Sequence, residues 1–167
     1  GSFIPPEFVR DWRDLTRMRK GMQAHLADYK RRIHKLFESA NIKLGSVLSD
    51  IFGATGQRLM HLLIARSTDI TLEDIEACMH GPLKSDSQDV LQAVKGFFRE
   101  HHRYMLKKYL RMIASLEKEL ADLDQRLTTL MESYHSHLQR LEAIPGISMT
   151  SAKLILSEIG PTLDQFS

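Results

Sequence analysis

Residues in the second half of the chain recur at alternating intervals of four and three, and nearly all of them are apolar. They are Tyr109, Ile113, Leu116, Leu120, Leu123, Leu127, Leu130, Tyr134, His137, Leu141 and Ile144. A seven-residue repeat places one narrow stripe along a helix, and such a stripe is buried when the helix winds around another helix. The pattern therefore predicts a coiled-coil helix.

A second periodic segment occupies the N-terminal part of the chain. Proline fits the first turn of a helix and an acidic residue favours the positive end of its dipole, so Pro5-Pro6-Glu7 predicts a helix start. Spacings of three and four then continue to Ala40, through Phe8, Trp12, Leu15, Met18, Met22, Leu26, Tyr29, Ile33 and Leu36. At about 1.5 Å per residue, this helix would be about 50 Å long.

The intervening residues, about 41–89, predict a small cap of short helices. Gly45, Gly53, Gly56 and Gly81-Pro82 divide this segment. One short helix is expected around residues 59–64, and residues 71–74 form a capping box, with Thr71 as the cap and Asp74 three residues later. Ser85-Asp86 or Ser87 should start a further element.

The last long helix is expected to begin near Asp89 and end at about Ala143. The predicted fold is all-α: two long antiparallel coiled-coil helices in residues 7–143, joined by the cap and followed by a helix-hairpin-helix in residues 144–167. The second long helix would exceed the first by several turns, and a second copy of the chain could cover the excess. The expected dimerisation residues are Tyr109, Ile113, Leu116, Leu120, Leu123, Leu127, Leu130 and Tyr134.

The hairpin after Ile144 is the best candidate for a binding site. Its turn would expose backbone N–H groups at a helix N-terminus, which suits a phosphate oxygen, and Lys153 would add charge. The candidate nucleic-acid contacts are Pro145, Gly146, Ile147, Ser148, Thr150 and Lys153. Hairpins of this type commonly have glycine where this chain has Ser148, and a plain helical corner that binds nothing is the alternative.

Composition and charge narrow the classes of function. Hydrophobic residues make up 43% and charged residues 26%, and no apolar run reaches the length of a membrane span. The single cysteine, Cys78, excludes an internal disulfide and fits a reducing, cytoplasmic compartment. The net charge of +2 permits nucleic-acid contact without requiring it.

Local clusters of cations carry more information than the net charge. They occur at residues 17–20, 30–32 and 103–111, and closely spaced cations on a helix can follow a phosphate backbone. An ordinary solvated helix face is the alternative. The pairs His101-His102 and His135/His137 could suggest a metal, but zinc needs three or four convergent ligands, so packing and surface roles are favoured. No motif for a catalytic site or a metal site is found.

Several segments together resemble transposases of the insertion-sequence 110 family. Residues 2–7 and 13–20 resemble the stretch that leaves the RuvC-like domain of that family, and residues 40–53 are similar to the tip of its coiled coil. Residues 98–103 resemble the start of the returning helix, and residues 141–147 with 152–160 resemble the opening of the C-terminal transposase domain. The resemblance covers essentially the whole chain.

The resemblance implies a part of an enzyme that cuts and rejoins DNA strands in a prokaryotic cytoplasm. The family's acidic, Mg²⁺-binding set would lie before Gly1 and its serine after Ser167, so residues 1–6 would be the exit from the RuvC-like domain and no catalytic residue or cofactor is assigned here. The implied partners are a second copy of the chain, DNA and, in the RNA-guided members, a guide RNA. A stand-alone coiled-coil scaffold for protein assembly and an enzyme using the histidines are the alternative hypotheses.

Overall fold

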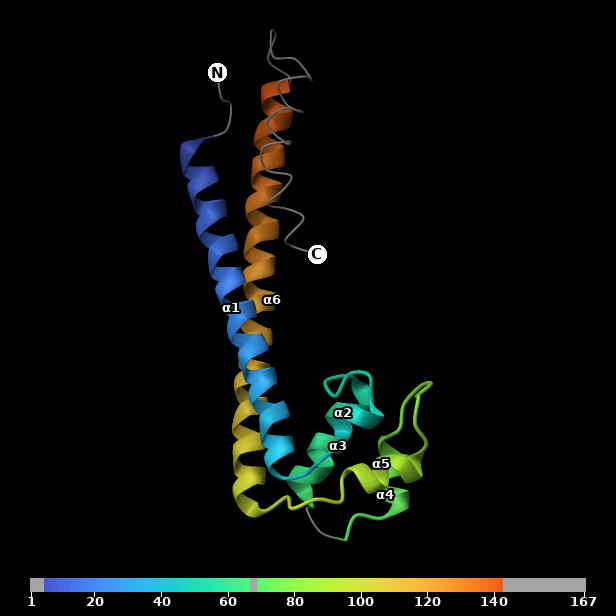
Figure 1. Ribbon diagram of the computed structural model, residues 1–167. Coiled ribbons are helices and arrows are strands. Elements are labelled where there is room, and N and C mark those ends of the chain that lie inside the picture. Colours follow the sequence, from blue (N-terminus) through green and yellow to red (C-terminus); the bar gives the residue numbers. More distant parts are fainter. Residues whose placement is uncertain (1–4, 67–68, 143–167) are drawn as a thin grey trace. The chain divides into compact units, whose positions relative to one another are not determined.

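The computed structural model describes residues 5–66 and 69–142, and every regular element in this part of the chain is an α-helix (Figure 1). The elements are α1 (Pro6–Ser39), α2 (Leu44–Val47), α3 (Ala54–Ala65), α4 (Leu72–Cys78), α5 (Ser87–Ala93) and α6 (Glu100–Glu142). The chain divides into two compact units. We call the described residues 5–26 and 115–142 the helix-pair unit and residues 27–114 the cap unit. The predicted all-α fold is confirmed.

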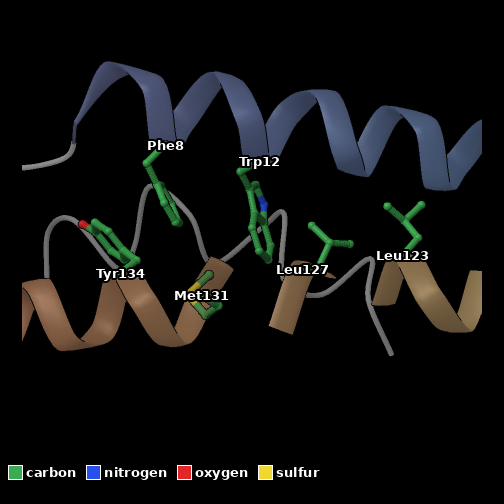
Figure 2. Packing of buried hydrophobic residues seen from close by; sticks show 6 residues of the cluster. All are labelled: Phe8, Trp12, Leu123, Leu127, Met131 and Tyr134. Carbon is green, nitrogen blue, oxygen red and sulfur yellow. The ribbon is translucent and has the colours of Figure 1, made fainter. Parts of the chain in front are cut away.

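The core of the helix-pair unit joins the start of α1 to the second half of α6. Its buried members are Phe8, Trp12, Leu123, Leu127, Met131 and Tyr134, and Figure 2 shows them directed toward one another from the two helices. The rings of Phe8 and Tyr134 stack with centroids 4.3 Å apart. Early residues of α1 thus contact late residues of α6, so the two helices are antiparallel in this unit, as predicted from the cap that joins them.

The inner face of α1 differs from the prediction at one position. Met18 was placed on the apolar stripe, but its side chain is 54% exposed. Arg19 turns inward instead, and its Nε donates a hydrogen bond to Asp124 Oδ1 over 2.6 Å. At 3.6 residues per turn, Arg19 follows Trp12 and Leu15 on the inner face more closely than Met18 does. The seam therefore contains the ion pair of Arg19 and Asp124 among its apolar residues.

The cap unit has a separate apolar core that gathers residues from all the short helices and from the adjoining turns of α1 and α6. Its fully buried side chains are Ile33, Leu44, Leu59, Met60, Leu63, Ile75, Val90 and Leu106. Helix α4 packs against α3 and α5, and α2 packs against α5. The predicted capping box is confirmed: the Thr71 hydroxyl accepts from the Asp74 N–H over 3.2 Å, and the Asp74 carboxylate accepts from the Thr71 N–H over 2.9 Å.

Two glycines permit close backbone approaches within the cap unit. Gly56 was expected to interrupt the helices, but it lies in the first turn of α3, where a Cβ would overlap the carbonyl group of Ile51. Gly96 lies between α5 and α6, and a Cβ there would collide with the carbonyl oxygens of Ala40 and Asn41. Both positions accept glycine because only a residue without a side chain fits the gap.

The prediction of one continuous helix from Asp89 to Ala143 is wrong at its beginning. Helix α5 ends at Ala93, and α6 begins only at Glu100. Two hydrogen bonds hold the intervening turn against the end of α1: the Phe97 N–H donates to the Ala40 carbonyl over 2.7 Å, and the Lys43 N–H donates to the Ala93 carbonyl over 2.8 Å. These bonds and the contact at Gly96 favour a break over a continued helix.

His102 caps the start of α6. Its Nδ1 accepts a hydrogen bond from the Arg99 N–H over 3.0 Å, and the Arg99 carbonyl accepts the helical bond from the Arg103 N–H. His102 therefore occupies the place that glutamate or glutamine takes in a capping box. The imidazole is buried and stacks on Phe98, with ring centroids 5.7 Å apart. Burial, followed by the charges of Arg99 and His101, lowers the pKa of His102 below its ordinary 6.5.

We expect the cap unit to lose stability in mild acid through this residue. Because the folded pKa lies below the unfolded one, the contribution of neutral His102 is complete above pH 6.5 and declines as the pH falls below it. The free energy of unfolding, measured with urea, should be lower at mildly acidic pH than at neutral pH. The expected deficit is about 1 kcal/mol, the usual contribution of a helix cap. His102→Gln keeps the acceptor but does not titrate, so it should reduce the deficit, and an unchanged pH dependence in this variant would contradict the assignment.

Candidate nucleic-acid interface

Several of the cations that the sequence offered for phosphate contact are engaged by the chain itself. Arg19 is bound to Asp124, and Arg103 Nη2 lies 2.7 Å from Glu100 Oε2. Arg32 Nε donates to Asp28 Oδ2 over 2.9 Å, and this hydrogen bond is the main reason that the pKa of Asp28 is lowered. The clusters at residues 17–20 and 30–32 therefore offer less free charge than their sequence suggests.

The basic turns of α6, which we define as Lys107, Lys108 and Arg111, have exposed side chains in the cap unit. The buried side of the same turns is formed by His102, Leu106 and Ile113. At 3.6 residues per turn, Lys108 and Arg111 lie on the side of α6 opposite Leu106, and Lys107 lies at its flank. Glu100, bound to Arg103, is the one acidic residue between Phe97 and Met112. Along this segment of α6, cations therefore outnumber carboxylates.

Tyr104 adds an exposed ring to the basic turns. Its side chain is 61% exposed, and Lys108 Nζ lies 5.4 Å from the ring centroid. We did not select Tyr104 from the sequence, because it lies outside the apolar stripe. Tyr104 lies one helical turn before Lys108 and opposite Leu106. These two spacings could have indicated an aromatic residue on the same side of α6 as the cations.

The predicted dimerisation residues lie in the packing of this chain's own helices. Four of them are buried and the others half-buried; the buried ones are Ile113, Leu123, Leu127 and Tyr134. The later start of α6 also reduces the excess length that motivated a second copy: α1 has 34 residues and α6 has 43. Self-association through this stripe stays a prediction. The argument that the stripe is left uncovered, however, no longer applies over residues 109–134.

The remaining candidate residues receive little structural support. The hairpin residues Pro145, Gly146, Ile147, Ser148, Thr150 and Lys153 lie outside the described residues. Within residues 5–66 and 69–142, no three histidine, cysteine or carboxylate side chains converge as metal ligands. His101 lies edge-on against the capping His102, with ring centroids 5.6 Å apart. In the same part of the chain, no helix has the length and apolar character needed to cross a membrane.

Comparisons with protein-family models, with curated proteins and with solved structures find no match for this chain. Exposed cations on one side of a helix, with few carboxylates nearby, can contact phosphate oxygens without reading base edges.

Proposed function

We propose that this chain is the coiled-coil region of a DNA transposase of the insertion-sequence 110 family, and that its basic turns contact the nucleic-acid backbone. The observation that carries the proposal is the exposed set Lys107, Lys108 and Arg111 on a helix whose opposite side is buried. The resemblance of residues 40–53 and 98–103 to the tip and returning helix of the family's coiled coil supports it. In the structure these segments contain the turn that follows α1, helix α2 and the start of α6.

The proposal extends to partners and to the parent reaction. DNA is the expected ligand, a guide RNA is expected in the RNA-guided members, and a second copy of the chain remains a proposed partner. Strand cutting and rejoining would use groups that the resemblance does not place among the residues of this chain. Mg²⁺ would belong to those groups.

Charge reversal on the basic turns tests the phosphate contact. We expect the chain to bind a fluorescent DNA duplex with a Kd of about 10⁻⁴ to 10⁻⁶ M, the range of contacts made without sequence readout. Replacing Lys107, Lys108 and Arg111 by glutamate should abolish this binding, and each cation removed should lower the salt slope by about 1. Fluorescence anisotropy over a salt series measures both quantities.

A lysine in the helix-pair unit provides the matched control. Lys118 is also exposed on α6 but lies between Glu117 and Glu119. Lys118→Glu should therefore leave duplex binding nearly unchanged, whereas Lys108→Glu should weaken it. Equal effects of the two single variants, or binding that does not respond to salt, would contradict the proposal. The stand-alone scaffold would then be the better explanation of the fold.

A further inference from the structure

Exposed apolar side chains are concentrated in the basic part of the cap unit. Among the described residues, the large hydrophobic side chains with the greatest exposure are Met18, Phe97, Tyr104 and Met112. Three of these four lie within residues 97–112, which also carry five arginines and lysines against one glutamate. Isolated apolar residues are common on protein surfaces, but aromatic rings among cations form a distinct combination.

Tyr104, Lys108 and Met112 follow one another at single helical turns on the exposed side of α6. Lys108 is about 6 Å further along the helix axis than Tyr104, and Arg111 about 10 Å. Lys108 Nζ lies over one face of the Tyr104 ring, 5.4 Å from its centroid, so the opposite face is the one on which a base could stack. A flat apolar surface is thus presented next to positive charge.

Phe97 supplies a second exposed ring just before this helix begins. Its side chain is 74% exposed, although its backbone is fixed by the hydrogen bond to the Ala40 carbonyl. The close contact at Gly96 holds the preceding residue against the end of α1. The ring is therefore displayed from an anchored backbone and is not part of the core.

We propose that the start of α6 is a binding surface for single-stranded DNA, with a base stacked on Tyr104 and the adjacent phosphates held by Lys108 and Arg111. Paired bases are stacked within a duplex, whereas the bases of a single strand can stack on aromatic side chains, and cations along the same groove follow the backbone. An acidic protein surface would also satisfy the cations, and competition by polyglutamate makes this alternative an outcome of the test.

The choice of DNA over RNA rests on the proposed transposase function, whose reaction acts on DNA strands. A ribose 2′-hydroxyl both donates and accepts hydrogen bonds, so the lysine and arginine donors of the basic turns could also contact RNA, and comparison with oligo(U) distinguishes the two ligands.

The test compares three fluorescent ligands of equal length, about 15 nucleotides, within the range of site sizes for single-strand binding folds. They are oligo(dT), oligo(U) and a mixed-sequence DNA duplex, with polyglutamate as competitor. We expect oligo(dT) to bind more tightly than the duplex at the same salt concentration. Tyr104→Ala should weaken oligo(dT) binding about tenfold, the usual effect of losing one stacked base. It should change duplex binding less than about twofold, because phosphate contacts dominate there.

Two variants test whether the aromatic ring of Tyr104 is responsible for the binding of oligo(dT). Tyr104→Phe keeps the stacking face and should bind oligo(dT) nearly as the native chain does. Met18→Ala removes another exposed apolar side chain, this one from the helix-pair unit, and should have no effect. Because Tyr104 is exposed, alanine there should leave the helix content unchanged, and circular dichroism checks this.

The possible failures are distinguishable. Tyr104→Ala could weaken the binding of oligo(dT) and of the duplex equally, or could change neither. Either result refutes stacking, while duplex binding still supports the proposed function. Equal or tighter binding of oligo(U) overturns the assignment to DNA, and efficient competition by polyglutamate shows that charge alone explains the surface. If no nucleic acid binds at low salt, both proposals fail.

Discussion

Replacing Trp12 by alanine should lower the free energy of unfolding of the helix-pair unit by about 3–5 kcal/mol. The indole is 3% exposed and lies within the apolar cluster that α1 shares with α6 (Figure 2). Its removal would leave a cavity bordered by Phe8 and Leu127, and two antiparallel helices have few other residues with which to refill it. Urea unfolding followed by circular dichroism measures the loss.

A large side chain on the same helix serves as the control for Trp12. Met18 is 54% exposed, so Met18→Ala should change the free energy of unfolding by no more than about 0.5 kcal/mol. A loss below about 1 kcal/mol for Trp12→Ala, far under the usual cost of removing a buried large side chain, would show that the observed packing is not the stable one in solution.

Replacing Gly56 by alanine should also be strongly destabilising, through a clash and not a cavity. The added methyl group would overlap the backbone of Ile51 at the start of α3, so either the helix or the preceding turn must move. Overpacking of this kind costs about 1–3 kcal/mol, and more where backbone atoms are involved. Chemical unfolding of the variant should show a lower midpoint.

Gly21 offers the matched glycine-to-alanine control. It lies inside α1, and a Cβ at this position meets nothing within 4 Å. Alanine has the higher helix propensity, so Gly21→Ala should raise stability by about 1 kcal/mol. Opposite signs for the two substitutions are expected, and a gain in stability for Gly56→Ala would contradict the close approach to Ile51.

Local signals in the sequence were sufficient to predict much of the fold. The proline-glutamate start and the three-four spacing predicted α1, and the Thr71–Asp74 pair predicted the start of α4. Asp86, one of three candidates for the next start, is the residue that caps α5. Each of these features depends on residues within a few positions of one another, so no knowledge of the tertiary structure was needed.

The errors arose where distant residues decide the outcome. Gly96 is unexceptional in a helical pattern, and its role becomes evident only when the carbonyl groups of Ala40 and Asn41 approach it. Met18 and Arg19 are adjacent, and the partner that satisfies the inward-facing Arg19, Asp124, lies on another helix. Residues 143–167, including the proposed phosphate-binding hairpin, lie outside the described part of the chain.

In the candidate interface, too, some features could be predicted from the sequence and others only from the tertiary structure. The sequence identified the cation clusters, but it could not show which cations are already bound to carboxylates, because Arg19 and Asp124 are far apart along the chain. Nor did the apolar pattern reveal Tyr104, whose importance depends on its exposure. Charge counted along the sequence therefore overestimates the charge available to a ligand.

The ion pair between Arg19 and Asp124 has a consequence for how this coiled coil could change length. A single polar pair within an apolar seam distinguishes one alignment of two helices from its neighbours. Insertion of seven residues into α1 alone between Trp12 and Arg19 would preserve the apolar face and leave Arg19 beside Asp124, but it would carry Phe8 and Trp12 two turns away from Leu127 and Tyr134. A matching insertion between Asp124 and Leu127 would be needed in α6. The coiled coil can therefore become longer in this alignment only if both helices gain the same number of residues on the same side of the ion pair.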